Sequence, residues 1–146
     1  MRVMVLIKSD KNSETGIPLT KETKETFAAM GKFNEELVRA GVILAGEGLQ
    51  PSSKGKRVRF SGKERTVIDG PFPETKELIG GFWLWQVKSM DEAVEWLKRA
   101  PFEGEKEVEI RQVFDAEDFG REFAPELRAQ EERLRAQISG KNTNAA

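Results

Sequence analysis

Apolar residues alternate with polar ones, or run together, in several short segments that are typical of β-strands. In the segment 2–8, Val3, Val5 and Ile7 would face one side of a sheet, and the apolar residues between them would face the other. Both faces of this strand are therefore expected to meet apolar material. Further strands are predicted at 42–45, 57–60, 64–68, 81–87 and 108–113. The second and third of these form a predicted hairpin around a Ser-Gly-Lys turn.

Two segments carry apolar residues at the spacing of an amphipathic helix. The first begins after Thr20, which is a favourable N-cap residue, and ends at Gly41, a residue type that commonly follows a helix. The second begins after Ser89 with a capping-box pattern and ends before Pro101. The polar stretch 9–19 contains a glycine and a proline and is expected to be a loop.

The predicted elements follow the order βαβ, hairpin, βαβ within residues 1–114, which we interpret as one domain with one core. Residues 115–146 form a C-terminal extension. Pro125 suits the first position of a helix, and the apolar residues after it form only a narrow stripe. A solvated helix that lies along its own domain or along a dimer mate explains this stripe better than an independent coiled coil does. Residues 141–146 are expected to be disordered.

The charge of the chain excludes some classes of partner. Its 24 Lys and Arg and 25 Asp and Glu are well mixed and leave a net charge of −1. Nucleic acid is not an expected partner, because binding it requires a concentrated basic face. One basic cluster surrounds the predicted hairpin and consists of Lys54, Lys56, Arg57 and Arg59. It lacks an interleaved aromatic platform and is interpreted as ordinary surface.

The chain contains neither Cys nor His. Disulfides, thiolate nucleophiles and zinc–thiolate sites are therefore excluded, and acid–base chemistry would fall to Asp, Glu or Lys. No metal or cofactor site is predicted, and Gly46-Glu47-Gly48 lacks the third glycine and the helix of a nucleotide-binding loop. No apolar run approaches the roughly 18 residues of a membrane span, so no membrane partner is expected and the predicted location is the cytoplasm.

Residues 69–77 read Asp-Gly-Pro-Phe-Pro-Glu-Thr-Lys-Glu and follow a predicted strand. This string resembles the motif of the DGPF (DGPFAETKE) group of YCII-related proteins at every position except Pro73, where that group usually has Ala. The segments 40–49 and 91–96 are similar to the same family, and the resemblance covers about residues 1–114. It implies an α+β, ferredoxin-like fold with an antiparallel sheet that pairs as a homodimer into a dimeric α/β barrel, followed here by a C-terminal helix.

The motif admits a structural and a functional interpretation. In the structural one, Asp caps its own turn, Gly relieves backbone strain and Pro fixes φ. In the functional one, the turn gathers an acid, an apolar wall and a cation in one pocket, formed by Asp69, Phe72, Glu74 and Lys76. Lys76 is then either a solvated charge or the group that binds the carboxylate of a small ligand.

Two further residues are candidates for the same site. Glu47 stands between two glycines after a strand and is either an ordinary exposed residue or part of the site, since a ferredoxin-like fold could bring this strand end near that of Asp69. Two carboxylates in one cleft can share a proton, so that one of them acts as a base near neutral pH. Trp83, with Trp85, resembles a stacking pair for an aromatic ligand, although large rings on a central strand usually belong to a core.

Three functions remain open at this level. Some YCII-type relatives rely on a His–Asp pair, which this His-free chain cannot carry, whereas the resemblance to the DGPF group implies an accessory or sensory role, often beside extracytoplasmic-function sigma factors. The first hypothesis is a dimeric module that binds a small molecule. The second is a cofactor-independent lyase, isomerase or dehydrohalogenase that acts on a small organic anion, with Asp69 or Glu47 as base and Lys76 as anchor. The third is a structural dimer whose C-terminal helix recruits a protein partner.

Overall fold

The computed structural model describes residues 1–74, 76–120 and 125–143, with no side-chain description for 141–143. The chain divides into two compact units, Met1–Val113 and Phe114–Ala146. The elements of the first unit are, in chain order, β1 (Arg2–Lys8), α1 (Lys11–Thr15), α2 (Lys21–Arg39), β2 (Ile43–Gly48), η1 (Ser52–Lys54), β3 (Lys56–Ser61), β4 (Glu64–Asp69), β5 (Ile79–Gln86), α3 (Met90–Lys98) and β6 (Val108–Gln112).

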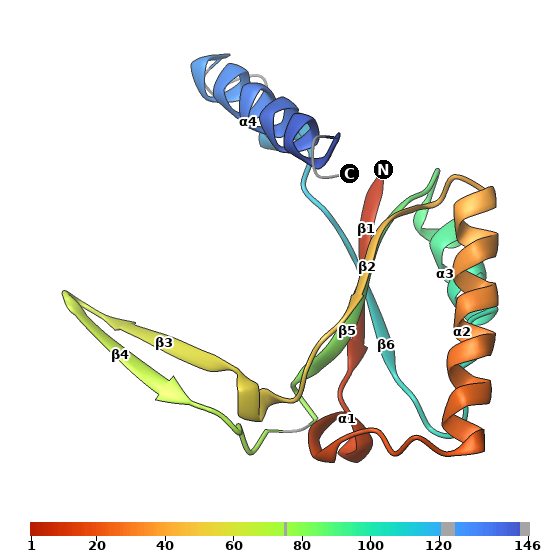
Figure 1. Ribbon diagram of the computed structural model, residues 1–146. Helices are drawn as coiled ribbons and strands as arrows, with labels where there is room; N and C mark the ends of the chain where they lie inside the picture. Colours follow the sequence, from red (N-terminus) through yellow and green to blue (C-terminus); the bar gives the residue numbers. More distant parts are fainter. Residues whose placement is uncertain (75, 121–124, 144–146) are drawn as a thin grey trace. The chain divides into compact units, whose positions relative to one another are not determined.

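Four strands of this unit form one antiparallel sheet in the order β2-β5-β1-β6, and β3 and β4 form a separate hairpin. Helices α2 and α3 lie on the same face of the four-stranded sheet (Figure 1). Two βαβ halves with antiparallel neighbouring strands and both helices on one face make a ferredoxin-like α+β fold. The predicted fold class is confirmed, and the hairpin is inserted between the two halves.

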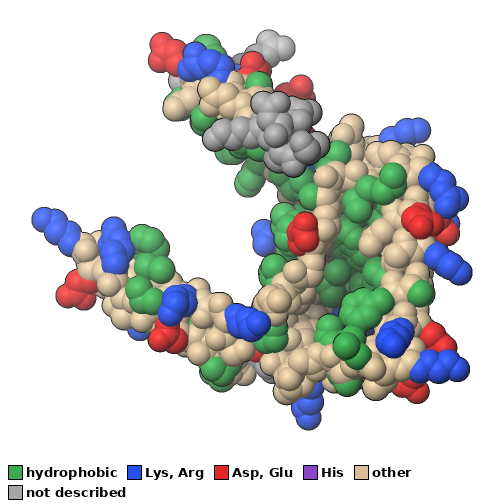
Figure 2. All heavy atoms as spheres, viewed as in Figure 1, with side chains coloured by type: hydrophobic (Ala, Val, Ile, Leu, Met, Phe, Trp, Pro, Cys, Tyr) green, Lys and Arg blue, Asp and Glu red, His purple; other side chains and the backbone are tan. Residues whose placement is uncertain are grey.

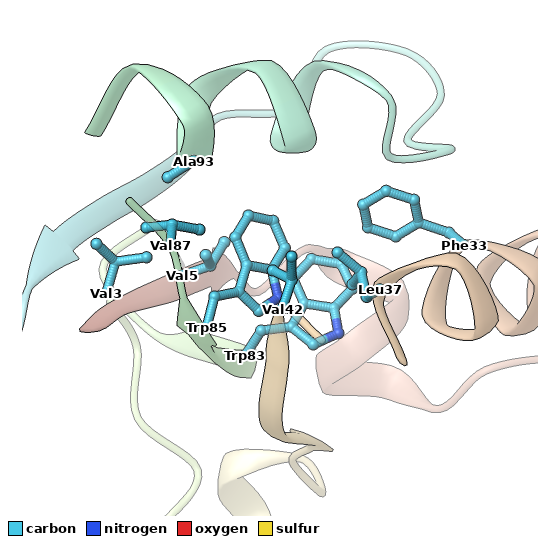
Figure 3. Packing of buried hydrophobic residues seen from close by; sticks show 9 residues of the cluster. All are labelled: Val3, Val5, Phe33, Leu37, Val42, Trp83, Trp85, Val87 and Ala93. Atoms are coloured by element: carbon cyan, nitrogen blue, oxygen red, sulfur yellow. The ribbon is translucent and has the colours of Figure 1, made fainter. Parts of the chain in front are cut away.

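The helix-covered face of the sheet carries the core. Val3 and Val5 of β1 lie opposite Trp85 and Trp83 of β5, and all four side chains are buried. Figure 3 shows these rings and valines facing α2 and α3, which contribute the remaining core side chains Phe33, Leu37 and Ala93; Val42 and Val87 complete the cluster. The period-2 pattern seen in the sequence therefore assigns the correct residues to the core face.

Helices α2 and α3 begin where their caps were predicted. The hydroxyl of Thr20 accepts a hydrogen bond from the backbone N–H of Thr23, and that of Ser89 accepts one from Glu92. Such caps contribute about 1 kcal/mol each. After α2, Gly41 adopts a positive φ of 69°, in agreement with its predicted place after the helix.

The expectation of a loop over residues 9–19 is wrong in part, because α1 occupies Lys11–Thr15. Asp10 caps this helix: its carboxylate accepts hydrogen bonds from the backbone N–H of Ser13 at 2.8 Å and from the hydroxyl of Ser13 at 3.0 Å. A five-residue helix with no buried side chain has no apolar stripe, so it produces no periodic signal in the sequence.

The opposite face of the sheet is apolar at its centre. Met4, Leu6, Phe82 and Leu84 lie on this face and are half-buried. The sequence predicted that both faces of β1 would meet apolar material, but within residues 1–113 the helices α2 and α3 cover only the face of Trp83 and Trp85 (Figure 1). We call the other side the open face.

The hairpin β3–β4 extends away from the four-stranded sheet (Figure 1). Eleven of the twelve residues in its two strands are exposed, and Ile68 is half-buried. It is longer by one or two residues per strand than the sequence predicted, because the last residue pairs, Lys56 with Asp69 and Ser61 with Glu64, still satisfy the antiparallel register.

The second unit contains η2 (Ala116–Phe119) and α4 (Pro125–Thr143). Pro125 is the first residue of α4, as its fixed φ predicts. Residues 141–143, expected to be disordered, are the last residues of this helix, and 144–146 lie outside the described residues. Among the helices that the structure describes, none is long and apolar enough to span a membrane.

Candidate functional site

A cavity of about 360 Å³ lies where α2 meets the edge strand β2 and its neighbour β5. Figure 2 shows hydrophobic side chains gathered between β2 and α2, with the surface hollowed there. The lining residues come from β1, α2, β2 and β5, and they are Ile7, Phe27, Met30, Asn34, Ile43, Gly46, Glu47, Gly48, Gly80, Gly81, Phe82 and Trp83. A volume of this size fits a compact small molecule.

Trp83 forms the fixed wall of this cavity. Its indole Nε1–H donates a hydrogen bond to Oδ1 of Asn34 at 3.0 Å, and its ring meets that of Phe33 edge-on with a centroid separation of 5.6 Å. The side chain is buried, so Trp83 belongs to the core, and it also lines the cavity. Stacking on an aromatic ligand stays a prediction. The sequence did not single out Asn34, because a lone amide on a helix carries no pattern.

Glycines let the backbone approach the ring closely. A Cβ atom added at Gly46 would lie 2.6 Å from Cδ1 of Trp83, and one at Gly81 would lie 3.0 Å from the carbonyl oxygen of Glu47. A Cβ at Gly48, in contrast, would meet nothing within 4 Å. The glycines at 46 and 81 are therefore needed for close packing, whereas the space beside Gly48 is open.

Glu47 lines the cavity, but its side chain is exposed and lies on the open face of the sheet. The register pairs Glu47 with Phe82, a residue of the open face, and pairs its neighbour Gly46 with Trp83 on the helix-covered face. Glu47 thus stands at the border of the cavity, where β2 separates the two faces.

The first two residues of the motif, Asp69 and Gly70, contact the base of the hairpin. The carboxylate of Asp69 forms an exposed ion pair with Nζ of Lys56, its cross-strand neighbour, at 2.5 Å. The backbone N–H of Gly70 donates to the carbonyl of Gly55 at 3.0 Å. A Cβ at Gly70 would lie 1.7 Å from the carbonyl oxygen of Ser52, so only glycine fits at this position.

Arg57 contacts two further motif residues, Phe72 and Glu74. Its guanidinium lies 3.8 Å from the centre of the Phe72 ring and forms an ion pair with Glu74 at 3.2 Å. Two cations that the sequence analysis assigned to ordinary surface, Lys56 and Arg57, are therefore the partners of the acidic motif residues. The signal that would have identified them is the position of Lys56 and Arg57 at the start of β3, beside Asp69 at the end of β4.

A hydrogen-bonded chain connects the motif to α1. The backbone N–H of Phe72 donates to Oγ of Ser52 at 3.0 Å, and Ser52 in turn donates from its hydroxyl and its backbone N–H to the carboxylate of Glu14. The backbone donation spans 3.0 Å. These contacts join residues about 20 to 40 positions apart, so no local sequence pattern reveals them.

Lys76 lines a different cavity, of about 680 Å³, together with Lys8, Ser9, Asp10 and residues 104–107. Nζ of Lys106 lies 3.3 Å from the carboxylate of Asp10. Burial raises the pKa of Asp10, but the hydrogen bonds from Ser13 and the charge of Lys106 outweigh that effect, so its pKa lies below the ordinary value.

The predicted site residues are thus distributed over three places. Glu47 and Trp83 share the cavity beside α2, Lys76 belongs to the cavity around Asp10, and the hairpin base holds Asp69, Phe72 and Glu74. Asp69 is not among the residues that line the cavity of Glu47. In the described residues, no group of three or more His, Cys, Asp or Glu side chains is placed to hold a metal ion.

Residues 1–117 match the family model of the YCII-related domain. A stretch of 78 residues is 32% identical to "Uncharacterized protein R00369" of Rhizobium meliloti (strain 1021). This match covers 53% of the present chain and 63% of that relative, so the chain spans less than two thirds of the relative's length.

Proposed function

The chain belongs to the YCII-related domain family, and on this premise we propose that it is a dimeric small-molecule-binding protein of the DGPF group with an accessory or sensory role. The observation that carries the proposal is the cavity walled by Trp83. We place the protein in the cytoplasm, a location with which its cysteine-free composition is compatible.

The lining of the cavity indicates the chemistry of the ligand. Phe27, Met30 and Ile43 supply apolar surface, and the ring of Trp83 supplies a flat one. Because Oδ1 of Asn34 already accepts the indole N–H, the amide NH₂ of Asn34 is left to donate to a ligand. We therefore infer a compact, largely apolar or aromatic molecule that carries one carbonyl, carboxylate or hydroxyl acceptor.

The open face supports the dimer. A half-buried apolar centre formed by Met4, Leu6, Phe82 and Leu84 is costly to leave in water, and pairing with a second copy would bury it. A measurement of solution mass at micromolar concentration tests this part of the proposal. A monomer at that concentration would overturn it.

The contacts favour binding over catalysis. The enzyme hypothesis requires a carboxylate base, Asp69 or Glu47, beside Lys76 as the anchor of the substrate. Asp69 is instead paired with Lys56, and Glu47 and Lys76 line separate cavities, so these positions do not support it. The position of Trp83, by contrast, supports a bound ligand directly.

A thermal-shift screen against a metabolite library tests the binding site. A ligand at one hundred times its dissociation constant raises stability by about 2.7 kcal/mol. We expect a hit to disappear in Gly48→Val, which fills open space beside the cavity, and to persist in the control Gly31→Ala, which adds a methyl group to open space on α2. The hit should also persist in Asp69→Asn. A hit that survives Gly48→Val would place the ligand elsewhere.

A further inference from the structure

The hairpin β3–β4 has one apolar face. Val58 lies opposite Val67, and Phe60 lies opposite Arg65, so Val58, Phe60 and Val67 share a side of the two-stranded sheet. Their exposed fractions are 51%, 70% and 60%. Figure 2 shows hydrophobic side chains exposed on this hairpin. A two-stranded hairpin with an uncovered apolar face is marginally stable in water, which indicates that another surface covers it.

The base of the hairpin is held firmly. Gly70 bonds to Gly55 across the base, and Arg57 contacts both Phe72 and Glu74 just beyond β4. The bond from Phe72 to Ser52 extends this connection toward α1. Gly70, Phe72 and Glu74 of the motif therefore anchor the hairpin, which we call the arm.

The open face of the four-stranded sheet offers a matching row. The registers place Glu47, Phe82, Leu6 and Glu109 side by side across β2, β5, β1 and β6. Two apolar side chains are thus flanked by a carboxylate at each edge of the sheet. On the hairpin, the pair Val58–Val67 is flanked on the same face by Arg65 and by Lys56, whose ammonium group is paired with the carboxylate of Asp69.

The hairpin β3–β4 also differs from the rest of the chain in the sign of its net charge. Residues 56–69 contain five Lys or Arg and two Asp or Glu, although the whole chain has a net charge of −1. The arm is therefore positive and the remainder negative, which favours association of the arm with a second copy of this chain. The arm's own chain leaves Val58 and Val67 exposed.

We propose that the hairpin β3–β4 of one copy lies on the open face of a second copy, with Val58 and Val67 against Phe82 and Leu6 and with its cations beside Glu47 and Glu109. This inference rests on the dimer of the proposed function and names the element that forms it. Because Glu47 and Phe82 also line the cavity of Trp83, the partner's arm completes the border of the binding site.

Engineered cysteines test the contact cleanly, because the chain has none of its own. Val58→Cys is mixed with a Leu6→Cys protein that carries a tag of different mass, and the mixture is oxidised. A disulfide between the two chains is expected. Arg59→Cys is the matched control, because its side chain lies on the other face of the same strand, and it should give no cross-link with Leu6→Cys.

A charge placed in the contact provides a second test. Val67→Asp should weaken dimerisation at least tenfold, whereas Thr66→Asp, one position away and on the other face, should leave the dissociation constant unchanged. If the protein is a dimer but shows neither the cross-link nor this loss of affinity, the proposed contact of the hairpin is wrong, and the proposed dimer is not. A monomeric parent protein overturns both. In the double variant Val58→Cys/Leu6→Cys, a disulfide that forms only within a single chain would show that the hairpin does not contact a second copy.

Discussion

The indole Nε1–H of Trp83 donates to the side-chain oxygen of Asn34 across 3.0 Å, joining the inner strand β5 to the middle of α2. This bond fixes the plane of the ring that walls the cavity. It also fixes the orientation of the Asn34 amide, because only the oxygen accepts an indole proton. One polar contact thus supports the packing of α2 and orients an amide that lines the cavity.

Replacement of Asn34 by Leu should lower the free energy of unfolding by about 1 to 3 kcal/mol, because the partly buried indole N–H loses its acceptor. Chemical denaturation measures this loss. Asn34→Asp is the control, since it keeps an acceptor oxygen and should be closer to the parent protein. Equal stability of the Leu variant and the parent would contradict the structural role of this bond.

Gly70→Ala should destabilise the first unit by about 1 to 3 kcal/mol or more, because the added Cβ would lie 1.7 Å from the carbonyl oxygen of Ser52. The matched control is Gly31→Ala, where the Cβ meets nothing within 4 Å and the helix gains about 0.5 to 1 kcal/mol. Thermal denaturation of the two variants should therefore move in opposite directions. If Gly70→Ala leaves the stability unchanged, the base of the hairpin has room to shift.

Arg57→Ala should loosen the motif at 69–77 by removing both the ion pair to Glu74 and the stacking on Phe72. The expected cost is about 1 kcal/mol, because the groups are partly exposed. Hydrogen exchange at Phe72 should become faster. Arg59→Ala is the control on the same hairpin face, since Arg59 forms no ion pair within the described residues. Unchanged exchange in Arg57→Ala would mean that backbone bonds alone hold the motif.

The folded-state pKa of Asp10 lies below its ordinary value, so the unfolded chain binds more protons over the window below about pH 4. The carboxylate therefore stabilises the fold above the unfolded pKa, and this contribution disappears as the pH falls through the folded pKa. Asp10→Asn keeps the helix cap and removes the charge beside Lys106. Its deficit, below about 1 kcal/mol, should be present at pH 6 and should shrink as the pH falls below the unfolded pKa toward the lowered folded pKa. A deficit independent of pH would exclude the charge as its cause.

The strands and long helices were predictable because their signals are local. Alternation in 2–8 and 81–87 identified the faces of Val5 and Trp83, and the caps at Thr20 and Ser89 marked the helix starts. Helix α1 was missed because its signal is one capping carboxylate, Asp10, with no buried side chain after it.

The sequence identified individual residues of the candidate site, but not which of them lie together. Glu47, Trp83 and Lys76 were all singled out from the sequence, and the structure places the first two at one cavity and the third at another. Which residues share a cavity depends on strand order and register, and neither is encoded in the spacing of residues along the chain.

The amino-acid sequence by itself determined the order βαβ, hairpin, βαβ, the core face of the sheet, and the absence of Cys and His chemistry, because periodicity, caps and composition are properties of short segments or of the whole chain. Only the tertiary structure decided that Asn34 meets Trp83, that Lys56 and Arg57 hold the motif, and that Glu47 stands in a row with Phe82. These contacts join residues brought together by sheet pairing and helix packing, and such long-range neighbours exist only once the chain has folded.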